Sequence, residues 1–235
     1  MKIGLLIGTY NEAENIKNIV AAVFSQNIAG LEIVIIDDNS PDGTGQIADG
    51  LKSQDRRVHV IHRPSKLGLG TAYIAGIKYA FERGAEYIIE MDADFSHDPK
   101  RLPVMIERLE KDADVVIGSR FVEWGKNDVD FIRRVVSRFG GIYTRLVLGP
   151  PINDFTGGFN AFRRKVLESI GLEKIRASNF SFHIETKYRA YKKKFRVVEI
   201  PIIFPRRKSG KTKFYFRMLL ESMWSVLKLR FRKID

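Results

Sequence analysis

The chain has 235 residues, of which 44% are hydrophobic and 16 are phenylalanine, so it can bury a sizeable core and is not intrinsically disordered. It contains no cysteine, which excludes disulfides and thiolate metal sites. Its 40 Lys and Arg against 28 Asp and Glu give a net charge of +12. That excess indicates an anionic partner: nucleic acid, an anionic membrane or a phosphorylated substrate.

Residues 1–120 alternate short β-branched runs with longer stretches of helical period. The expected strands are hydrophobic almost throughout, which is typical of a parallel sheet covered on both faces; they span residues 2–8, 31–37, 57–63, 86–92 and 113–119. The expected helices between them span residues 11–26, 42–54, 68–84 and 98–112. The first strand ends in polar turn residues, which argues against a signal peptide. This half predicts an α/β nucleotide-binding unit.

The pattern changes after Arg120. We expect, in chain order, a polar loop (121–130), a basic helix (131–149), a turn-rich connection (150–164), a helix (181–195), a strand (196–204), a basic loop (205–214) and a final helix from residue 214. No window of about 18 to 20 residues is free of charged side chains, so we expect no membrane-spanning helix.

Acidic residues stand where two of the expected parallel strands end, at the edge where such sheets bind ligands. Asp37 and Asp38 follow the second strand, and Asp92 and Asp94 follow the fourth. An isolated Asp-x-Asp pair is more often loop solvation or a helix cap, but two carboxylates also suit Mg²⁺ or Mn²⁺ held together with substrate phosphates. The chain has neither G-x-x-x-x-G-K-[ST] nor G-x-G-x-x-G after its first strand, which argues against a P-loop NTPase or a dinucleotide enzyme.

Seven segments, in order and over nearly the whole chain, resemble the inverting family 2 glycosyltransferases of the GT-A fold. They are GTYNEAENI (8–16), IVIIDDNSPDGT (33–44), KLGLGTAYIAGI (66–77), MDADFSHDP (91–99), VIGSRF (116–121), DFTGGFNAFRR (154–164) and SFHIETKYRAYKKKFRVVEIPIIF (181–204). Within that family they are most similar to the dolichyl- and polyprenyl-phosphate mannose synthases. The resemblance implies an α/β GT-A (Rossmann-like) fold, with a mixed, mostly parallel sheet flanked by helices. It implies one GT-A domain over residues 1–212, divided into a nucleotide-sugar half (1–120) and an acceptor half (121–212).

The resemblance also implies which residues of the first half bind a nucleotide sugar. Among them Tyr10, Glu12 and Asp38 would contact the nucleoside, while Asp92 and Asp94 would hold Mg²⁺ or Mn²⁺ and the diphosphate. The whole set is Thr9, Tyr10, Glu12, Asp37, Asp38, Lys66, Gly68, Asp92, Ala93 and Asp94. His97, beside the acidic pair, is a further candidate for a metal or diphosphate contact, whereas His59 and His62 lie in a strand and are expected to be structural.

For the acceptor, the resemblance places four residues at positions that bind a lipid phosphate: Arg120, Arg133, Ser137 and Arg207. Arginine suits this task because it offers two parallel donors to phosphate oxygens, although each arginine could also be a solvated surface charge. A phosphate monoester, with a second pKa of about 6, is already largely ionised at pH 7, so no general base is expected. Asp94 and Arg120 would be the catalytic residues.

Asp154 and Gly158, in the DFTGGF segment, would line the sugar pocket by resemblance; the simpler interpretation is a turn with two glycines. Three positions depart from the family pattern. Gly8 stands where many relatives have Pro, Gly157 where many have Ser, and Ser96 where some have Gln near the metal. A serine hydroxyl is a poor substitute for that Gln, which leaves a third protein ligand of the metal open.

Residues 213–235 predict a basic amphipathic helix with a narrow polar stripe formed by Arg217, Glu221, Ser225, Lys228 and Arg232. Such a helix can lie in a membrane interface, or it can pack against the domain or against a membrane-anchoring subunit. The positive net charge favours an anionic membrane surface. We therefore expect a peripheral location on the cytoplasmic face of a membrane.

The function expected from all of this is metal-dependent, inverting transfer of a hexose, mannose from GDP-mannose, to dolichyl or polyprenyl phosphate. One alternative is the same reaction with UDP-glucose or another nucleotide sugar. Another is a non-catalytic nucleotide-sugar-binding subunit of a membrane complex. Nucleic acid is not an expected partner, because the doubly acidic strand ends would repel a phosphate backbone.

Overall fold

The computed structural model describes residues 1–129, 131–175, 180–205, 216–232 and 234. As far as residue 119 its elements follow the predicted alternation of strands and helices. They are β1 (Ile3–Thr9), α1 (Ile16–Phe24), β2 (Leu31–Asp37), α2 (Thr44–Gln54), β3 (Val58–His62), α3 (Leu69–Glu82), β4 (Tyr87–Asp92), the 3₁₀ turn η1 (Pro99–Arg101), α4 (Leu102–Lys111) and β5 (Val115–Ser119).

The remaining elements, from residue 126 onward, include two long helices, one in the middle of the chain and one near its C-terminal end. They are β6 (Lys126–Asn127), α5 (Phe131–Leu148), β7 (Asn160–Arg163), α6 (Arg164–Ser169), the 3₁₀ turn η2 (Leu172–Lys174), α7 (Phe180–Lys192), β8 (Val197–Pro201), β9 (Ile203–Phe204) and α8 (Phe216–Phe231). The basic loop predicted over 205–214 lies almost wholly outside the described residues.

Within the described residues seven strands form one sheet, in the order β3-β2-β1-β4-β7-β5-β8. Every neighbouring pair is parallel except the two pairs made by β7, which runs antiparallel to β4 and β5. The prediction of a mixed, mostly parallel sheet is therefore confirmed.

Strand β7 corrects the prediction that residues 150–164 are only a turn-rich connection. Its four residues are inserted into the middle of the sheet, where Asn160 pairs with Glu90 of β4 and with Ile117 of β5. Because β7 is antiparallel, it begins at the edge where β4 and β5 end. The turn that precedes β7 is thereby brought to the same edge as the acidic pair. The predicted loop over 121–130 likewise contains a short strand, β6, which pairs with β9.

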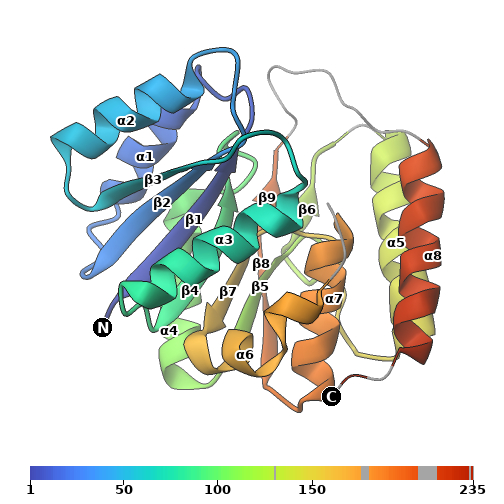
Figure 1. The fold of residues 1–235 in the computed structure, drawn as a ribbon. Helices are drawn as coiled ribbons and strands as arrows, with labels where there is room; N and C mark the ends of the chain where they lie inside the picture. Colours follow the sequence, from blue (N-terminus) through green and yellow to red (C-terminus); the bar gives the residue numbers. More distant parts are fainter. Residues whose placement is uncertain (130, 176–179, 206–215, 233, 235) are drawn as a thin grey trace.

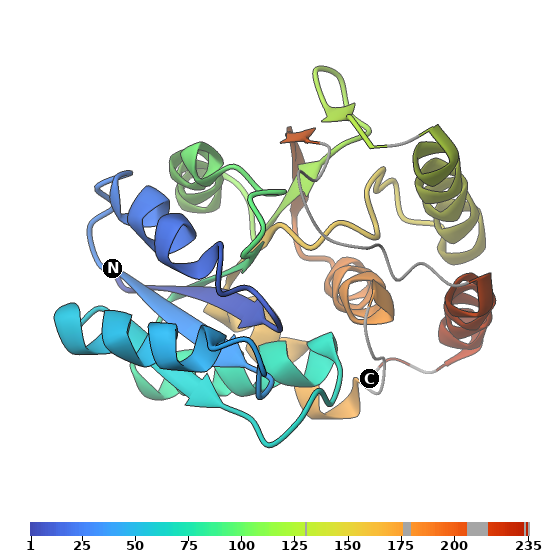
Figure 2. The same ribbon diagram turned by 90° about the horizontal axis from the view of Figure 1, so that it is seen from above.

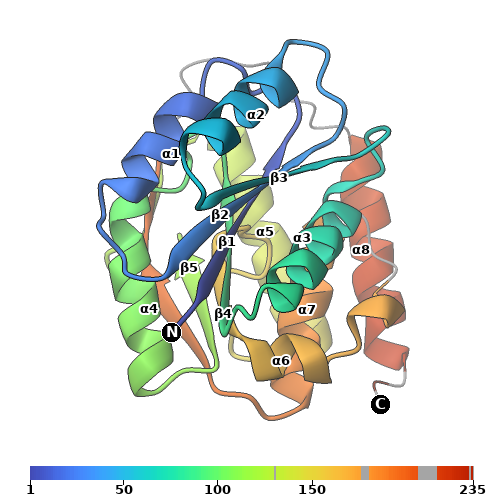
Figure 3. The same ribbon diagram turned by 60° about the vertical axis from the view of Figure 1, so that its left-hand side comes forward.

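Helices cover both faces of the sheet (Figure 3). On one face α1, α2 and α4 pack over side chains such as Leu5, and on the other α3, α6 and α7 pack over side chains such as Leu6. The two leucines are neighbours in β1, and both are fully buried. Successive side chains of a strand point to opposite faces, so a strand covered on both sides must be hydrophobic throughout.

Helices α5 and α8 lie side by side outside α7, as an additional layer (Figures 1 and 2). Val226 and Leu229 of α8 are buried against the rest of the fold, and the Tyr143 hydroxyl of α5 donates to the main-chain oxygen of Met223 at 3.2 Å. One side of the C-terminal helix therefore packs against the domain. That its other side lies in a membrane interface stays a prediction.

Candidate active site

The carboxyl ends of β1, β2, β4 and β5 meet at one edge of the sheet, because these strands run in the same direction. The loops that leave this edge contain four non-glycine residues with positive φ: Asn11 at 63°, Asn39 at 57°, Phe95 at 59° and Trp124 at 66°. Backbone of this kind is costly and clusters at functional sites. This edge is the candidate active site.

At the end of β2, Asp38 forms a buried ion pair with Arg63. The Arg63 Nη1 donates to Asp38 Oδ1 at 2.6 Å, and the two side chains are each 8% exposed. Burial raises the pKa of Asp38 above its ordinary value, although Arg63 and the nearby Lys66 act in the opposite direction. Arg63 also donates to the Thr71 hydroxyl of α3, which links two of the loops at this edge.

Asp37, by contrast, forms hydrogen bonds within its own loop. Its carboxylate accepts hydrogen bonds from the Ser40 main-chain N–H at 3.1 Å and from the Ser40 hydroxyl at 2.5 Å. The Thr9 hydroxyl at the end of β1 donates to the same carboxylate at 3.2 Å. Asp37 and Thr9 are both buried. The structure brings these two predicted residues together, as a connection between β1 and β2.

Tyr10 and Lys66, from two different loops, also meet at this edge. The Lys66 Nζ lies 4.1 Å from the centre of the Tyr10 ring. Glu12 accepts from the Asn15 side-chain amide at 2.9 Å, at the start of α1. Gly68 has φ +97°, a conformation that residues with a side chain rarely adopt, and it is the N-cap residue directly before α3. These residues, which the sequence predicts to bind the nucleotide, therefore lie in neighbouring loops at the carboxyl edge of the sheet.

In the acidic pair, Asp92 is the last residue of β4 and Asp94 lies in the tight turn that follows it. The Ser96 main-chain N–H donates to Asp94 Oδ1 at 3.0 Å, and the main-chain N–H of Asp92 donates to His97 Nδ1 at 3.0 Å. His97 is 2% exposed and stacks on Phe159 with ring centres 4.9 Å apart. Burial lowers the pKa of His97, which together with the accepting Nδ1 indicates a neutral ring. In that neutral ring the proton is on Nε2, which lies 3.8 Å from Asp92 Oδ2, so His97 faces the acidic pair as a donor and not as a metal ligand.

Within the part of the chain that the structure describes, no three His, Asp or Glu side chains are grouped closely enough to hold a metal by themselves. Two carboxylates nevertheless fit Mg²⁺ or Mn²⁺, which commonly take one or two carboxylates together with substrate phosphates and water. Asp92 keeps 35% of its side chain exposed, so it can be reached from solvent. The Ser96 hydroxyl is buried and has no hydrogen-bond partner among the described residues. It is therefore a polar group beside the acidic pair that a ligand or water could contact.

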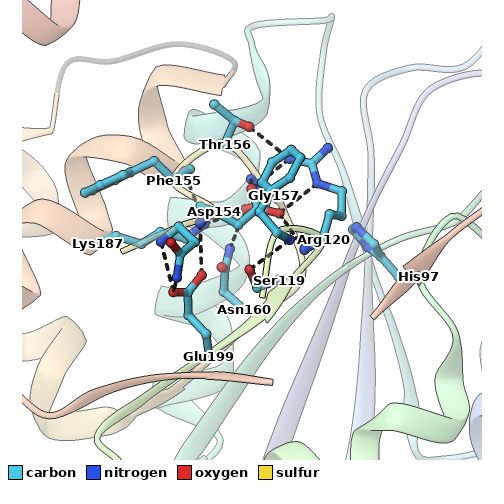
Figure 4. A network of polar contacts seen from close by, with 12 residues as sticks. His97, Ser119, Arg120, Asp154, Phe155, Thr156, Gly157, Asn160, Lys187 and Glu199 are labelled. Carbon is cyan, nitrogen blue, oxygen red and sulfur yellow. Dashed lines mark hydrogen bonds and ion pairs between the residues drawn. The ribbon is translucent and has the colours of Figure 1, made fainter. Parts of the chain in front are cut away.

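Arg120, directly after β5, is bound by Asp154 at several points (Figure 4). Its Nε and Nη2 donate to the two carboxylate oxygens, each at 2.7 Å, and its main-chain N–H donates to Oδ2 at 3.0 Å. The Nη2 also donates to the Thr156 hydroxyl at 2.9 Å. Burial alone would lower the pKa of Arg120, but Asp154, with a smaller contribution from Asp92, raises it. This leaves Nη1 as the nitrogen that can turn toward a phosphate.

The carboxylate of Asp154 is fully buried. Burial acts to raise its pKa, but the charge and hydrogen bonds of Arg120 hold it at about 2. Its Oδ1 also accepts from the Gly157 N–H at 2.9 Å. A direct hydrogen bond to a sugar would require one of these contacts to open, so the structure favours Asp154 as the residue that holds Arg120.

Gly158, the other predicted sugar-pocket residue, lies between two histidine rings. A Cβ at this position would be 3.2 Å from His183 Nε2 and 3.6 Å from His97 Cε1. His183 Nδ1 lies 3.2 Å from Glu90 Oε2, which also accepts from the Asn160 amide at 3.0 Å. Glu90 is fully buried and its Oε1 has no partner among the described residues. Glu90 connects this cluster to the acidic pair, because it lies on β4 two residues before Asp92.

The predicted acceptor residues are only partly described. Ser137 is half-buried on α5, and Arg133 belongs to the first turn of the same helix, but the Arg133 side chain lies outside the described part of the chain. Arg207 falls in the segment 206–215, also outside it. Among the described residues Arg120 is therefore the acceptor candidate that the structure places beside the acidic pair. The phosphate-binding roles of all four stay predictions.

Sequence reasoning did not single out Arg63, Lys187 or Glu199, which hold the site's loops. Glu199 of β8 accepts from the main-chain N–H groups of Asn153 and Asp154, each at 2.9 Å. Glu199 stands among apolar residues of an expected strand. A charged residue in such a strand was the one feature of the sequence that could have indicated a buried polar role for Glu199. Arg63 and Lys187 lie among many other basic residues, so their sequence context did not distinguish them. His59 and His62 are structural as expected, because they pair with Glu32 and Asp49 respectively.

The carboxyl edge of this mostly parallel sheet thus carries carboxylates and a largely buried arginine, an arrangement typical of ligand sites in α/β folds. Comparison with known proteins specifies the family. Residues 5–171 match glycosyl transferase family 2. The chain is 42% identical over 224 residues to the polyprenol monophosphomannose synthase of Mycolicibacterium smegmatis, covering 94% of this chain and 84% of that protein. It is 37% identical over 227 residues to the undecaprenyl-phosphate mannosyltransferase of Micrococcus luteus, covering 96% and 93%.

Solved structures agree on the fold. Glucosyl-3-phosphoglycerate synthase from Mycobacterium tuberculosis, in complex with Mn²⁺, UDP and phosphoglyceric acid, has a TM-score of 0.70 at 16% identity, covering all of this chain and 80% of that one. A mannosyltransferase from Pyrobaculum calidifontis, in complex with GDP-Man and Mn²⁺, has a TM-score of 0.67 at 17% identity, covering all of this chain and 66% of that one. The chain belongs to glycosyl transferase family 2.

Proposed function

We propose that this chain transfers mannose from GDP-mannose to a polyprenyl phosphate, with inversion at the anomeric carbon. The observation that carries the proposal is the match, over more than nine-tenths of this chain, to two relatives that are both named for joining mannose to a polyprenol phosphate. The arrangement at the sheet edge supports it, because a carboxylate pair and a buried arginine lie together there.

On the donor side, Asp92 and Asp94 would hold Mg²⁺ or Mn²⁺ together with the diphosphate. A metal bound there neutralises the negative charge that develops on the departing diphosphate. Asp38, kept in place by Arg63 and close to Lys66, would contact the nucleoside beside Tyr10. The buried surroundings of Asp38 strengthen such a hydrogen bond relative to one in water.

On the acceptor side, a lipid phosphate oxygen would attack the anomeric carbon while the bond from that carbon to the diphosphate breaks, and GDP leaves with the electron pair. The phosphate is already ionised near pH 7, so the chain needs to position it rather than remove a proton. Arg120 would do this with Nη1, since Asp154 occupies its Nε and Nη2. Arg133, Ser137 and Arg207 would complete the phosphate site.

We expect the chain to transfer labelled mannose from GDP-mannose to a short polyprenyl phosphate in the presence of Mg²⁺ or Mn²⁺, and to stop when a chelator removes the metal. Thin-layer separation of the labelled lipid measures the transfer. Parallel reactions with UDP-glucose and other nucleotide sugars test the donor. Transfer from UDP-glucose in place of GDP-mannose would correct the donor, and binding of a nucleotide sugar without transfer from any donor would contradict the catalytic function.

We further propose that the chain docks peripherally on an anionic membrane surface through α5 and α8. Each helix carries an exposed apolar stripe: Val135, Phe139, Ile142 and Leu146 on α5, and Trp224, Leu227 and Phe231 on α8. Basic residues such as Arg138 and Lys228 are exposed on the same two helices. Apolar bulk with basic residues is the composition that binds membrane interfaces. Among the described helices, none is long and apolar enough to cross a bilayer.

Leu146→Glu should weaken binding to vesicles that contain anionic lipid by about tenfold or more, because Leu146 is 78% exposed and its apolar side chain would enter the interface. Co-sedimentation with vesicles measures the change. Lys52→Gln is the matched control, since it makes the same change in net charge on α2, which lies across the molecule from α5 (Figure 1). Equal binding by the two variants would reject docking through α5 and α8.

A further inference from the structure

Lys187, on α7, is completely buried and holds three main-chain oxygens of one turn (Figure 4). Its Nζ donates to the carbonyl oxygen of Asp154 at 2.9 Å, to that of Phe155 at 3.2 Å and to that of Gly157 at 2.7 Å. A lysine ammonium has three N–H donors and no acceptor. Every donor of Lys187 is therefore matched with one oxygen of the turn formed by residues 154–157.

A buried charge at this position is costly for the fold. Burial lowers the pKa of Lys187 to about 8, although Asp154 and Glu90 act to raise it. Replacing a buried charge by a well-packed apolar residue is often neutral or stabilising, provided that no partner is left unpaired. At Lys187 that proviso fails, because loss of the ammonium would leave three carbonyl oxygens of the turn without a donor, so the lysine and the shape of the turn depend on each other.

The turn held by Lys187 is the one that carries the Asp154 carboxylate. Gly157 is fixed on both sides, because its oxygen accepts from Lys187 while its N–H donates to Asp154 Oδ1 at 2.9 Å. Glu199 fixes the other side of the turn through the main-chain N–H groups of Asn153 and Asp154. The turn is thus held between a cation from α7 and an anion from β8, and its carboxylate is directed at Arg120.

We propose that Lys187 is a positioning residue for the transfer reaction: by gathering the carbonyl oxygens of residues 154–157, it orients Asp154 and through it the Arg120 guanidinium beside the acidic pair. The kinetic part of this inference rests on the proposed function. The structural part does not, because the orientation of Arg120 can be observed without any transfer.

The first test observes the Arg120 Nε–H directly. In ¹H–¹⁵N spectra this proton should exchange slowly with water in the wild-type chain, because it is bonded to Asp154 at 2.7 Å in a buried site. Arg120→Lys identifies its signal. In Lys187→Gln the exchange should become much faster, whereas Arg189→Met should leave it unchanged. Arg189 is the matched control because it is also a buried cation of α7, but it bonds to Glu185 and to the Ile170 oxygen instead of the turn.

The second test is kinetic. In Lys187→Gln, kcat should fall by about 100-fold, the typical effect of misplacing a catalytic group by about 1 Å. Affinity for GDP-mannose, measured by calorimetry, should be unchanged, since Lys187 touches none of the proposed nucleotide residues. Absence of transfer in the wild-type chain would refute the proposed function alone. An unchanged Arg120 signal in Lys187→Gln would overturn the positioning role whatever the activity.

If Lys187→Gln does not fold, a titration of the wild-type chain from about pH 7 to about pH 9.5 replaces it. The charged groups that face Lys187 are Asp154, Glu90, Arg120 and Glu199. As Lys187 loses its proton and one of its donors, exchange of the Arg120 Nε–H should accelerate relative to that of Arg189 in the same sample. A constant ratio over this range would overturn the proposal.

Discussion

Asp94→Ala should lower the rate of mannose transfer by at least about a thousandfold, because the metal and the diphosphate would lose one of their two carboxylates. The fold should persist, because Asp94 is only half-buried in a loop at the edge of the sheet, outside the hydrophobic core. The measurement is transfer of labelled mannose across a range of Mn²⁺ concentrations. Binding of Mn²⁺ to the GDP-mannose complex should weaken in parallel.

Asp98→Ala is the control for that variant. Asp98 is an exposed carboxylate four residues further along, and it caps η1 by accepting from the Lys100 N–H at 3.0 Å. Its loss should cost about 1 kcal/mol of stability and leave the metal dependence of transfer unchanged. If Asp94→Ala and Asp98→Ala retained the same activity, the acidic pair would be ordinary loop solvation and the metal site would lie elsewhere.

The second large effect concerns stability. Asp154→Asn should lower the free energy of unfolding by about 3 to 5 kcal/mol, because it leaves the buried Arg120 charge without its partner. The pKa of Asp154 is held at about 2, below its ordinary value of 3.8. Its contribution is therefore fully present above about pH 4 and is lost only as the pH falls through about 2. The destabilisation should be the same at pH 5 and at about pH 6, a range that lies above the titration of Asp154 and below the pKa of about 8 of the neighbouring Lys187, in urea unfolding.

Asp114→Asn provides the comparison. Asp114 also pairs with a cation, Lys165, at 2.6 Å, but the Lys165 side chain is 59% exposed. Exposed pairs contribute about 0 to 1 kcal/mol, so this variant should change stability little. A loss from Asp154→Asn as small as that from Asp114→Asn would show that Arg120 finds other partners, and the assignment of Asp154 as its holder would be wrong.

The sequence was sufficient to predict which residues lie at the carboxyl edge of the sheet, but not which contacts they make there. Strands β1 to β5 are long apolar runs followed by polar turns, so their direction and the convergence of Asp38, Asp92 and Arg120 could be predicted from local pattern. Strand β7 was missed because it has only four residues and is stabilised by pairing with β4 and β5, which lie far from it in sequence. Short strands of this kind carry little local signal.

The same limit applies to the side chains of the site. Arg120 and Asp154 are 34 residues apart in sequence, and nothing local to either residue indicates that they pair. The resemblance placed Asp154 near the sugar, but it could not show that both carboxylate oxygens are already occupied. Lys187 and Arg189 are similar cations on one helix, and only the packing of α7 against the turn distinguishes their roles.

The insertion of β7 between β4 and β5 also bears on how such enzymes can diversify. Residues 1–120 supply both neighbours of β7, so a fragment ending at residue 120 would leave a gap between β4 and β5 in the middle of its sheet. The first and second halves are therefore interleaved rather than modular. Transplanting everything after residue 120 from a relative would also replace this central strand, so the grafted strand would have to pair with β4 and β5 of the recipient. Changes confined to side chains and surface loops leave that pairing intact.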